Sequence, residues 1–211
     1  MDIDEYLNNP CNMASIPYWK VQSMRIPNGM CIVHDDDYNE TKWYNYIDEL
    51  YFRLLHSLKD LKKPILPCGY SLHHAELNEY VQHIHRCYGD IDLSEQELQT
   101  YTMRTVYDPS LWVAIIKNDT GEIAATGIAE LDKDIGEGVL EWIQVSEDHR
   151  RRGLGTYIVS ELLFRMKNSA KFATVSGKCN DSSCPEMLYR KCGFTGSDIW
   201  HILRLKSEDT I

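Results

Sequence analysis

The stretch EWIQVSEDHRRRGLGT, residues 141–156, decides the fold of this chain. Its first five residues are typical of a β-strand that ends at Val145. A short polar loop follows, and Gly153 and Gly155 then open a helix. The N-terminus of a helix offers unpaired N–H groups and the positive end of the helix dipole, and glycine lets the backbone approach an anion closely. The segment therefore predicts a cradle for a pyrophosphate group.

Positive charge and a hydroxyl strengthen this interpretation. Arg150, Arg151 and Arg152 lie in the loop, and Thr156 lies in the first turn of the helix. Gly-x-Gly alone would fit a solvated basic turn better, so the pattern needs support from elsewhere in the chain. Two other phosphate motifs are absent: the chain has no Gly-x-x-x-x-Gly-Lys-Ser/Thr, and position 158 is Ile where the dinucleotide-binding pattern needs glycine.

Strand and helix patterns alternate on both sides of this segment. Apolar runs and turn signals predict strands at residues 65–70, 111–117, 123–131, 139–145, 172–178 and 199–205. Cap and stop residues predict helices at residues 71–88, from Ser94 to before Asp108, at 153–168 and at 185–192. Their order predicts an α/β fold with a mixed central sheet and helices on both faces.

Residues 1–63 are predicted to form an N-terminal extension ahead of a domain at residues 64–211. Residues 30–34 are typical of a strand. Apolar side chains then recur at spacings of three and four between Trp43 and Leu61, which predicts an amphipathic helix.

The composition disfavours several classes of partner. The 211 residues carry a formal net charge of −10. An acidic surface repels phosphate backbones, so we expect no nucleic-acid partner, and the charge weakly favours a cationic substrate. The apolar runs are far shorter than the roughly 20 residues of a membrane span, and the acidic N-terminus does not resemble a signal peptide. We therefore expect a cytoplasmic protein with no membrane partner.

The cysteines and histidines do not predict a metal centre. The seven cysteines are scattered along the chain and are expected to be free thiols. His83, His85 and Cys87 come nearest to a cluster. On a helix, however, side chains two positions apart diverge by about 200°, so we expect no metal there.

A second motif lies downstream, Leu188-Tyr189-Arg190-Lys191-Cys192-Gly193-Phe194. With Arg150-x-x-Gly153-x-Gly155 it resembles the GNAT superfamily of acetyltransferases. The family signature Arg/Gln-x-x-Gly-x-Gly/Ala opens the helix after the fourth strand, and its Leu-Tyr-x-Lys-x-Gly-Phe segment lies on the helix after the fifth. One helix and one strand separate the two motifs, as the family requires. The resemblance covers about residues 65–205, and the pair is far more specific than either motif alone.

The resemblance implies the GNAT fold, in which a splayed strand pair binds acetyl-CoA as acyl donor. Backbone groups of Ile143 and Val145 would pair with the pantetheine arm, and the Ile143 N–H would polarise the thioester carbonyl. The diphosphate would lie on the loop and helix start, at Arg150, Arg151, Arg152, Gly153, Leu154, Gly155 and Thr156. Many relatives also contact CoA through an asparagine before the tyrosine, a role open here to Asn180 or Ser183.

Two side chains are candidates for proton transfer. Tyr189 matches the family tyrosine that approaches the CoA sulfur, which implies a general acid; a tyrosine packed under the sheet is the alternative. Only a neutral amine attacks a thioester, so a base must take its proton. Strand alternation places Glu141 on the face of Ile143, which makes it the best candidate, although a solvent-facing glutamate fits equally. Glu130 is a second candidate with poorer support.

The resemblance therefore implies an N-acetyltransferase that moves an acetyl group directly to a primary amine of a small molecule or peptide. Cys184 and Cys192 flank the predicted helix, so an acyl-cysteine route is the alternative mechanism. A non-catalytic CoA-binding module and an interaction protein on the same fold are the alternative functions. The N-terminal extension would either wall the acceptor site or form the surface of a homodimer. The residues do not identify the acceptor amine.

Overall fold

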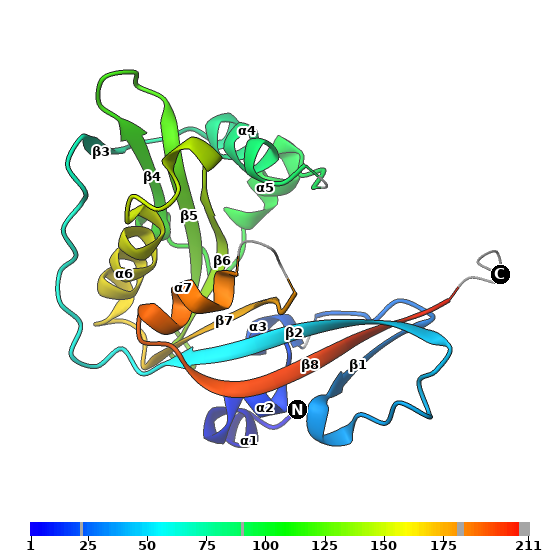
Figure 1. Ribbon diagram of the computed structural model, residues 1–211. Helices are drawn as coiled ribbons and strands as arrows, with labels where there is room; N and C mark the ends of the chain where they lie inside the picture. The colour runs from blue at the N-terminus through cyan, green and yellow to red at the C-terminus, as the bar shows by residue number, and fades with distance from the viewer. Residues whose placement is uncertain (22, 90, 181–183, 207–211) are drawn as a thin grey trace. The chain divides into compact units, whose positions relative to one another are not determined.

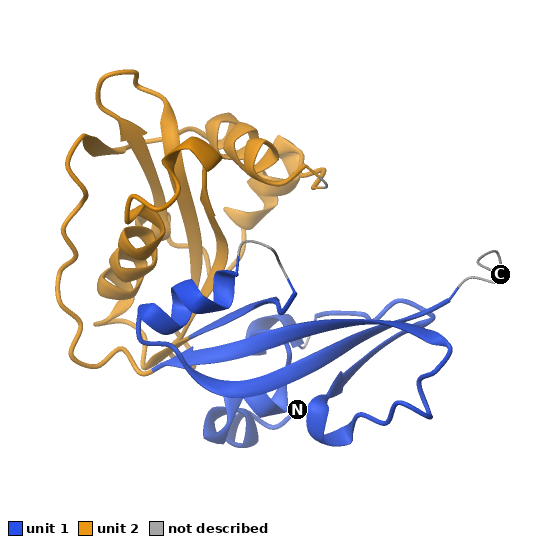
Figure 2. Ribbon diagram, viewed as in Figure 1, with its two compact units in different colours: residues 1–56, 174–211 blue, residues 57–173 orange. Residues whose placement is uncertain are grey.

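The computed structural model describes residues 1–21, 23–89, 91–180 and 184–206. The chain divides into two compact units, which Figure 2 colours separately. Unit 1 comprises Met1–His56 and Thr174–Ile211, and unit 2 comprises Ser57–Ala173. Each unit is described by itself below.

Unit 2 is built on four antiparallel strands, β3 (Tyr70–His73), β4 (Trp112–Lys117), β5 (Ile123–Asp132) and β6 (Glu137–Val145). Their order in the sheet is β6-β5-β4-β3. Trp112 lies opposite Ile128, and Ile128 lies opposite Trp142, so these three side chains form a row across the sheet. The strands predicted at residues 111–117, 123–131 and 139–145 are confirmed.

Helices cover both faces of this sheet (Figure 1). They are α4 (Leu77–Cys87), α5 (Glu95–Tyr101) and α6 (Leu154–Met166). Ile128 packs in one cluster with Leu98 of α5 and Ile84 of α4. The preceding residue, Gly127, faces the other way, because a Cβ there would meet Ile158 of α6. The predicted α/β class with helices on both faces is confirmed, and the splaying of a strand pair stays a prediction.

Unit 1 contains β1 (Met30–His34), β2 (Tyr46–His56), β7 (Phe172–Lys178, from Thr174 onward) and β8 (Thr195–Leu205) in the order β1-β8-β2-β7. Both β1 and β2 pair antiparallel with β8. Its helices are α1 (Ile3–Asn8), α2 (Pro10–Met13), α3 (Tyr18–Val21) and α7 (Pro185–Lys191).

The amphipathic helix predicted between Trp43 and Leu61 is wrong, because β2 lies there instead. Phe52, Arg53 and Leu54 are all buried, so the inner half of this strand does not alternate between a buried and an exposed face. Such a run cannot be distinguished from a helix by spacing alone. Cover on both faces explains the burial, since the Phe52 ring meets Tyr189 of α7 while Arg53, on the opposite face, binds Tyr6 of α1.

Two further boundaries differ near the start of unit 2. The strand predicted at residues 65–70 is β3, which begins at Tyr70, and the helix predicted from Ser71 begins at Leu77. Ser71 pairs with Ile116 of β4 and is therefore in the sheet. The capping box of Ser94 and Glu97 is confirmed at the start of α5.

A buried arginine ties the N-terminal helices to the sheet of unit 1. Arg53 is 1% exposed. Its guanidinium donates to the Tyr6 hydroxyl at 3.0 Å and to the Ser15 carbonyl at 3.2 Å, and also to Ser176 Oγ at 3.1 Å on β7. Residues 1–21 therefore pack on this sheet through specific hydrogen bonds as well as apolar contact.

Candidate functional site

The backbone of β6 presents one edge away from β5. The Ser146 N–H donates to the Ala124 carbonyl at 3.0 Å, just beyond the end of β6. Hydrogen-bonded and non-hydrogen-bonded pairs alternate along an antiparallel ladder. Val145 and Ile143, opposite Ala125 and Gly127, are therefore the non-hydrogen-bonded positions. Their N–H and C=O groups point away from β5, which is the orientation that the predicted pantetheine contacts require.

Two side chains donate hydrogen bonds to backbone carbonyls on that side of β6. The Tyr88 hydroxyl donates to the Ile143 carbonyl at 3.3 Å. Arg150 Nε donates to the Val145 carbonyl, also at 3.3 Å. The Ile143 N–H is therefore directed away from β5, to the side of β6 on which these two side chains lie.

A β-bulge lies in β6 at Glu141. Trp142 lies opposite Ile128 and Leu140 opposite Ala129, so Glu141 is an extra residue in the strand. Bulges break the alternation of side chains and re-aim them, often beside active sites. Simple alternation therefore does not fix the face of Glu141, which is half-buried.

The loop after β6 has the backbone of an anion site. It runs through a 3₁₀ turn at Glu147–His149 to α6. Arg151 has a φ of 59° and Gly153 a φ of 85°, both left-handed, and left-handed residues turn neighbouring N–H groups toward one side. Gly153 is the N-cap of α6, and no side chain in the described part of the chain caps that helix.

The first turn of α6 can meet a ligand through its backbone N–H groups, whereas at least one of its side chains is buried. Tyr157 donates to the Gly153 carbonyl at 2.9 Å, which closes the first turn. Helix geometry leaves the N–H groups of Leu154, Gly155 and Thr156 without intrahelical acceptors. The Leu154 side chain is 1% exposed, so that residue can bind an anion only through its backbone. The arginines at 150–152 are exposed.

Buried side chains hold this loop in place. The Tyr70 hydroxyl lies 3.0 Å from His149 Nδ1, and His149 is 5% exposed. Ser146 Oγ lies 2.9 Å from His83 Nε2 on α4. The loop is therefore anchored at both ends of its 3₁₀ turn, to β3 and to α4, so its N–H groups need little reordering to meet an anion.

His83 belongs to a buried polar network that sequence reasoning missed. It is fully buried, and its Nδ1 lies 2.8 Å from Thr126 Oγ1, which also accepts from Gln144 Nε2 at 2.5 Å. Burial above all, with the charges of Arg86 and His149, lowers the pKa of His83 to about 4. The sequence pattern that could have revealed it is the spacing of His83 with Tyr80 and Ile84, which places the three on the buried side of α4. No group of three or more His, Cys, Asp and Glu side chains in the described residues is arranged to hold a metal ion.

Glu130, the second candidate base, is committed elsewhere. Its carboxylate lies 2.5 Å from the Arg104 guanidinium and is 3% exposed. Proton transfer to this carboxylate would break its ion pair and leave the arginine uncompensated. Glu130 is therefore the weaker of the two glutamates.

The remaining candidates lie in unit 1. Tyr189 is buried, and its ring meets Phe194 at 5.7 Å and 70° and Phe52 at 6.1 Å and 55°. Asn180 is exposed after β7, and Ser183 lies outside the described residues. Cys184 is exposed at the N-cap of α7, and Cys192 is half-buried at its C-cap.

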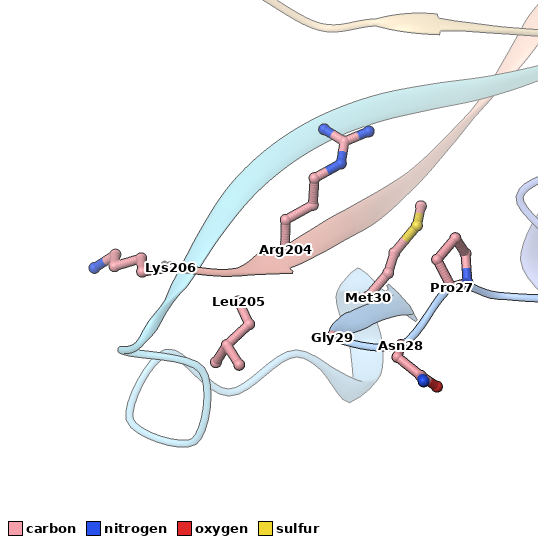
Figure 3. A pocket seen from close by; sticks show the side chains of 7 residues that line it. All are labelled: Pro27, Asn28, Gly29, Met30, Arg204, Leu205 and Lys206. Carbon is pink, nitrogen blue, oxygen red and sulfur yellow. The ribbon is translucent and has the colours of Figure 1, made fainter. Parts of the chain in front are cut away.

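A hollow of about 410 Å³ in unit 1 does not form an anion site (Figure 3). It is lined by the turn before β1 and by the end of β8. Arg204 and Lys206 point away from each other in this view. Arg204 is paired with Glu49, and Lys206 Nζ donates to the Tyr44 carbonyl at 2.9 Å. Both cations have partners of their own.

The sheet of unit 2, the bulged β6 and the glycine loop at the start of α6 define an α/β protein whose helix start has a backbone of the type suited to anions. The chain matches the acetyltransferase (GNAT) family over residues 74–194, which is more than half of its length. It belongs to that family. No match was found among curated proteins. In the described residues, no helix is long and apolar enough to cross a membrane.

Solved structures share the fold at low sequence identity. A GCN5-related N-acetyltransferase from Sphaerobacter thermophilus is 17% identical with a TM-score of 0.66, over 78% of this chain and 54% of that one. A GNAT-family acetyltransferase from Colwellia psychrerythraea is 16% identical with a TM-score of 0.60, over 83% of this chain and 65% of that one. A Drosophila protein is 18% identical with a TM-score of 0.59, over 76% of this chain and 52% of that one. The chain thus spans about half the length of the first and third of these proteins.

Proposed function

We propose that this protein is an N-acetyltransferase that moves an acetyl group from acetyl-CoA to a primary amine by direct transfer in a ternary complex. The observation that carries the proposal is the continuous segment from Glu141 to Thr156. It joins a bulge, a strand edge with outward N–H donors and an uncapped helix start, with left-handed residues at Arg151 and Gly153. Family membership supports acyl transfer as the chemistry.

The backbone of this segment would bind the donor. The N–H groups from Arg151 to Thr156 would hold the diphosphate, and the side chains of Arg150, Arg151 and Arg152 would add positive charge. The Ile143 N–H would donate to the acyl oxygen as negative charge develops there. Acetyl-CoA supplies the thioester that the amine attacks. Asn180 and Ser183 remain proposed as further CoA contacts.

Two side chains would move protons. Glu141 would take the proton of the amine, directly or through water, because the bulge sets it apart from the ladder and leaves it half-buried. Tyr189 would donate its hydroxyl proton to the departing thiolate. Neither step needs Cys184 or Cys192. The acidic net charge of −10 favours a cationic acceptor, either a small molecule or a peptide. A cytoplasmic location and a homodimer stay predictions.

The test measures thiol release from acetyl-CoA against a panel of primary amines. We expect turnover for the wild-type protein. In Glu141→Gln the rate should fall by roughly 10²-fold or more, and the decrease of rate toward acid pH that is set by this carboxylate should disappear. In Tyr189→Phe the ring contacts remain, so the rate should fall while the affinity for CoA is kept.

Binding without turnover would contradict this function. If the wild-type protein binds acetyl-CoA and transfers acetyl to none of the amines, it is a CoA-binding module. If Glu141→Gln keeps the wild-type pH–rate profile, Glu141 is not the base. If Tyr189→Phe turns over at the wild-type rate with chemistry limiting, Tyr189 only packs against Phe52 and Phe194.

A further inference from the structure

A cavity of about 450 Å³ lies in unit 2, and none of the described residues that line it belongs to the proposed acetyl-CoA cradle. It is lined by residues of the connection from β3 to α4, of α4 and α5, and of the segment that leads into β4. The cavity lies at the start of β4, where Trp112 is in register with Ile128 of β5. The acetyl-CoA cradle is proposed on β6, two strands away, and on the loop that follows it. Nothing in the proposed transfer uses this cavity.

Three aromatic rings form adjoining walls of the cavity. Trp112 meets Tyr80 at 5.2 Å and 76°, and it meets Tyr107 at 5.7 Å and 80°. Rings at near right angles enclose a corner and do not stack. Trp112 packs beside the core of unit 2, yet both Trp112 and Tyr107 are only half-buried. They therefore keep ring surface for a ligand.

The charge around this corner is negative. Glu76 lines the cavity and is exposed. Glu79 lies close behind it, with Oε2 accepting from the Glu76 N–H at 2.8 Å and Oε1 at 3.3 Å from His73 Nε2. Among the described residues that line the cavity there is no lysine or arginine. Arg165, whose charge reaches Tyr80, is paired with Glu161 at 2.8 Å.

Aromatic faces next to carboxylates suit one kind of ligand. The face of an aromatic ring is negative, and tryptophan binds cations best. An alkylated ammonium group is the cation that such a corner holds, because its methyl groups fill apolar space while its charge meets the ring faces. Gln99 and Thr102 of the opposite wall offer polar groups for the rest of the molecule.

We propose that this cavity is a binding site for a small organic cation with an alkylated ammonium group. The half-buried rings of Trp112 and Tyr107, which pack beside the buried Tyr80, hold the cationic head, and Glu76 of the lining supplies the negative charge. The site is separate from the acetyl-CoA cradle, and ligand binding there does not require acetyl transfer. The proposal therefore stands or falls independently of the proposed function.

The test is a calorimetric titration of the full chain with choline and with 3,3-dimethyl-1-butanol, its neutral isostere. We expect choline to bind and the isostere not to bind. Tyr107→Leu should weaken choline binding by roughly five- to thirtyfold, the worth of one cation–π contact. Glu76→Gln should weaken it less and should reduce its sensitivity to salt. Tyr101→Leu, a half-buried tyrosine that packs on the same core outside the cavity, is the matched control.

Each other outcome counts against the site. Equal binding of choline and its isostere would show an apolar cavity without cation recognition. No binding of choline, tetramethylammonium or butylammonium at millimolar concentration would overturn the proposal. If Tyr107→Leu and Trp112→Phe both bind choline as the wild-type protein does, the cation binds elsewhere. A thermal unfolding curve for each variant shows that it is folded.

Discussion

At the scale of single residues, the candidate site depends on backbone groups more than on side chains. The N–H groups of Ile143, Leu154 and Gly155 are set by the strand register and by the helix start. No substitution other than proline removes such a group, but its direction can be changed. Gly153, with a φ of 85°, is the residue whose replacement would do so.

His83 should make the free energy of unfolding depend on pH. Its pKa is about 4 in the folded chain, against an ordinary value of 6.5, chiefly because of burial. The unfolded chain therefore binds a proton first as the pH falls. Stability from this residue is present above pH 6.5 and is lost as the pH falls toward 4, by about 3 kcal/mol in all. Urea unfolding of the wild-type protein from pH 7.5 to 4 measures the loss.

The control for this prediction is His83→Gln. The variant loses hydrogen bonds to Thr126 and Ser146, so we expect it to be less stable at pH 7.5 by about 1–3 kcal/mol. It has no imidazole to protonate, so the difference from the wild-type protein should shrink as the pH falls. Two curves that run parallel would show that His83 does not titrate between these pH values.

Some of these residues could be predicted from the sequence and others could not. Arg150, Gly153 and Gly155 follow from a local motif, because a loop and a helix start are made by neighbouring residues. The face of Glu141 depends on a bulge, which is a property of two paired strands. The partners of His83 lie on β5 and after β6, so no local pattern contains them.

At the scale of elements, close packing of α6 on the sheet positions the glycine loop. Gly127 of β5 and Gly138 of β6 have no room for a side chain. A Cβ at Gly127 would clash with Ile158 and contact Leu162, and one at Gly138 would clash with Met166. The helix start, and with it the proposed diphosphate site, is therefore held at a distance from the sheet that only glycine permits.

Gly127→Ala should destabilise the chain by about 1–3 kcal/mol, because the methyl group must displace a β-branched side chain in the core. Gly138→Ala should cost less, because the methionine it meets is flexible. Thermal unfolding of both variants shows which substitution lowers the stability more. If Gly138→Ala is the more damaging, α6 does not pack against β5 as described.

The elements that the sequence predicted well are those with local signals. The strand at residues 172–178 and the helix start at Ser94 have clear boundaries in turns and caps, and both are confirmed. The sequence predicts a helix in place of β2, because the inner half of the strand is buried on both faces and lacks the alternation that marks a strand. Only its pairing with β8 reveals the strand, and that partner lies far along the chain.

At the scale of the whole molecule, the N-terminal segment contributes to the core of unit 1. β2 lies between β8 and β7, and Arg53 on β2 binds Tyr6 and Ser15 from the helical start of the chain. The predicted boundary between residues 63 and 64 implies that residues 64–211 fold without residues 1–63, and this stays a prediction. The sheet order argues that β8 and β7 depend on β2.

A chain that begins at residue 64 should therefore fold poorly. Removing β2 would leave β8 and β7 without their shared neighbour and would expose the apolar surface that covers Phe52 and Leu54. We expect loss of a cooperative thermal transition, or aggregation. Arg53→Met tests the same contacts more gently and should cost about 2–4 kcal/mol. A truncated chain that unfolds cooperatively near the wild-type midpoint would mean that residues 1–63 are a detachable extension.

The central claim is that the segment from Glu141 to Thr156 binds acetyl-CoA. Its most direct test is thermal unfolding with and without excess acetyl-CoA, for the wild-type protein, Gly153→Asp and Gly121→Asp. Gly121 is also left-handed, with a φ of 70°, but lies in the turn between β4 and β5. Ligand at 100 times its dissociation constant adds about 2.7 kcal/mol, which raises the midpoint by roughly 5–10 °C in a chain of this size. We predict this rise for the wild-type protein and Gly121→Asp, and none for Gly153→Asp. No rise in the wild-type protein, or an equal rise in Gly153→Asp, would contradict the claim.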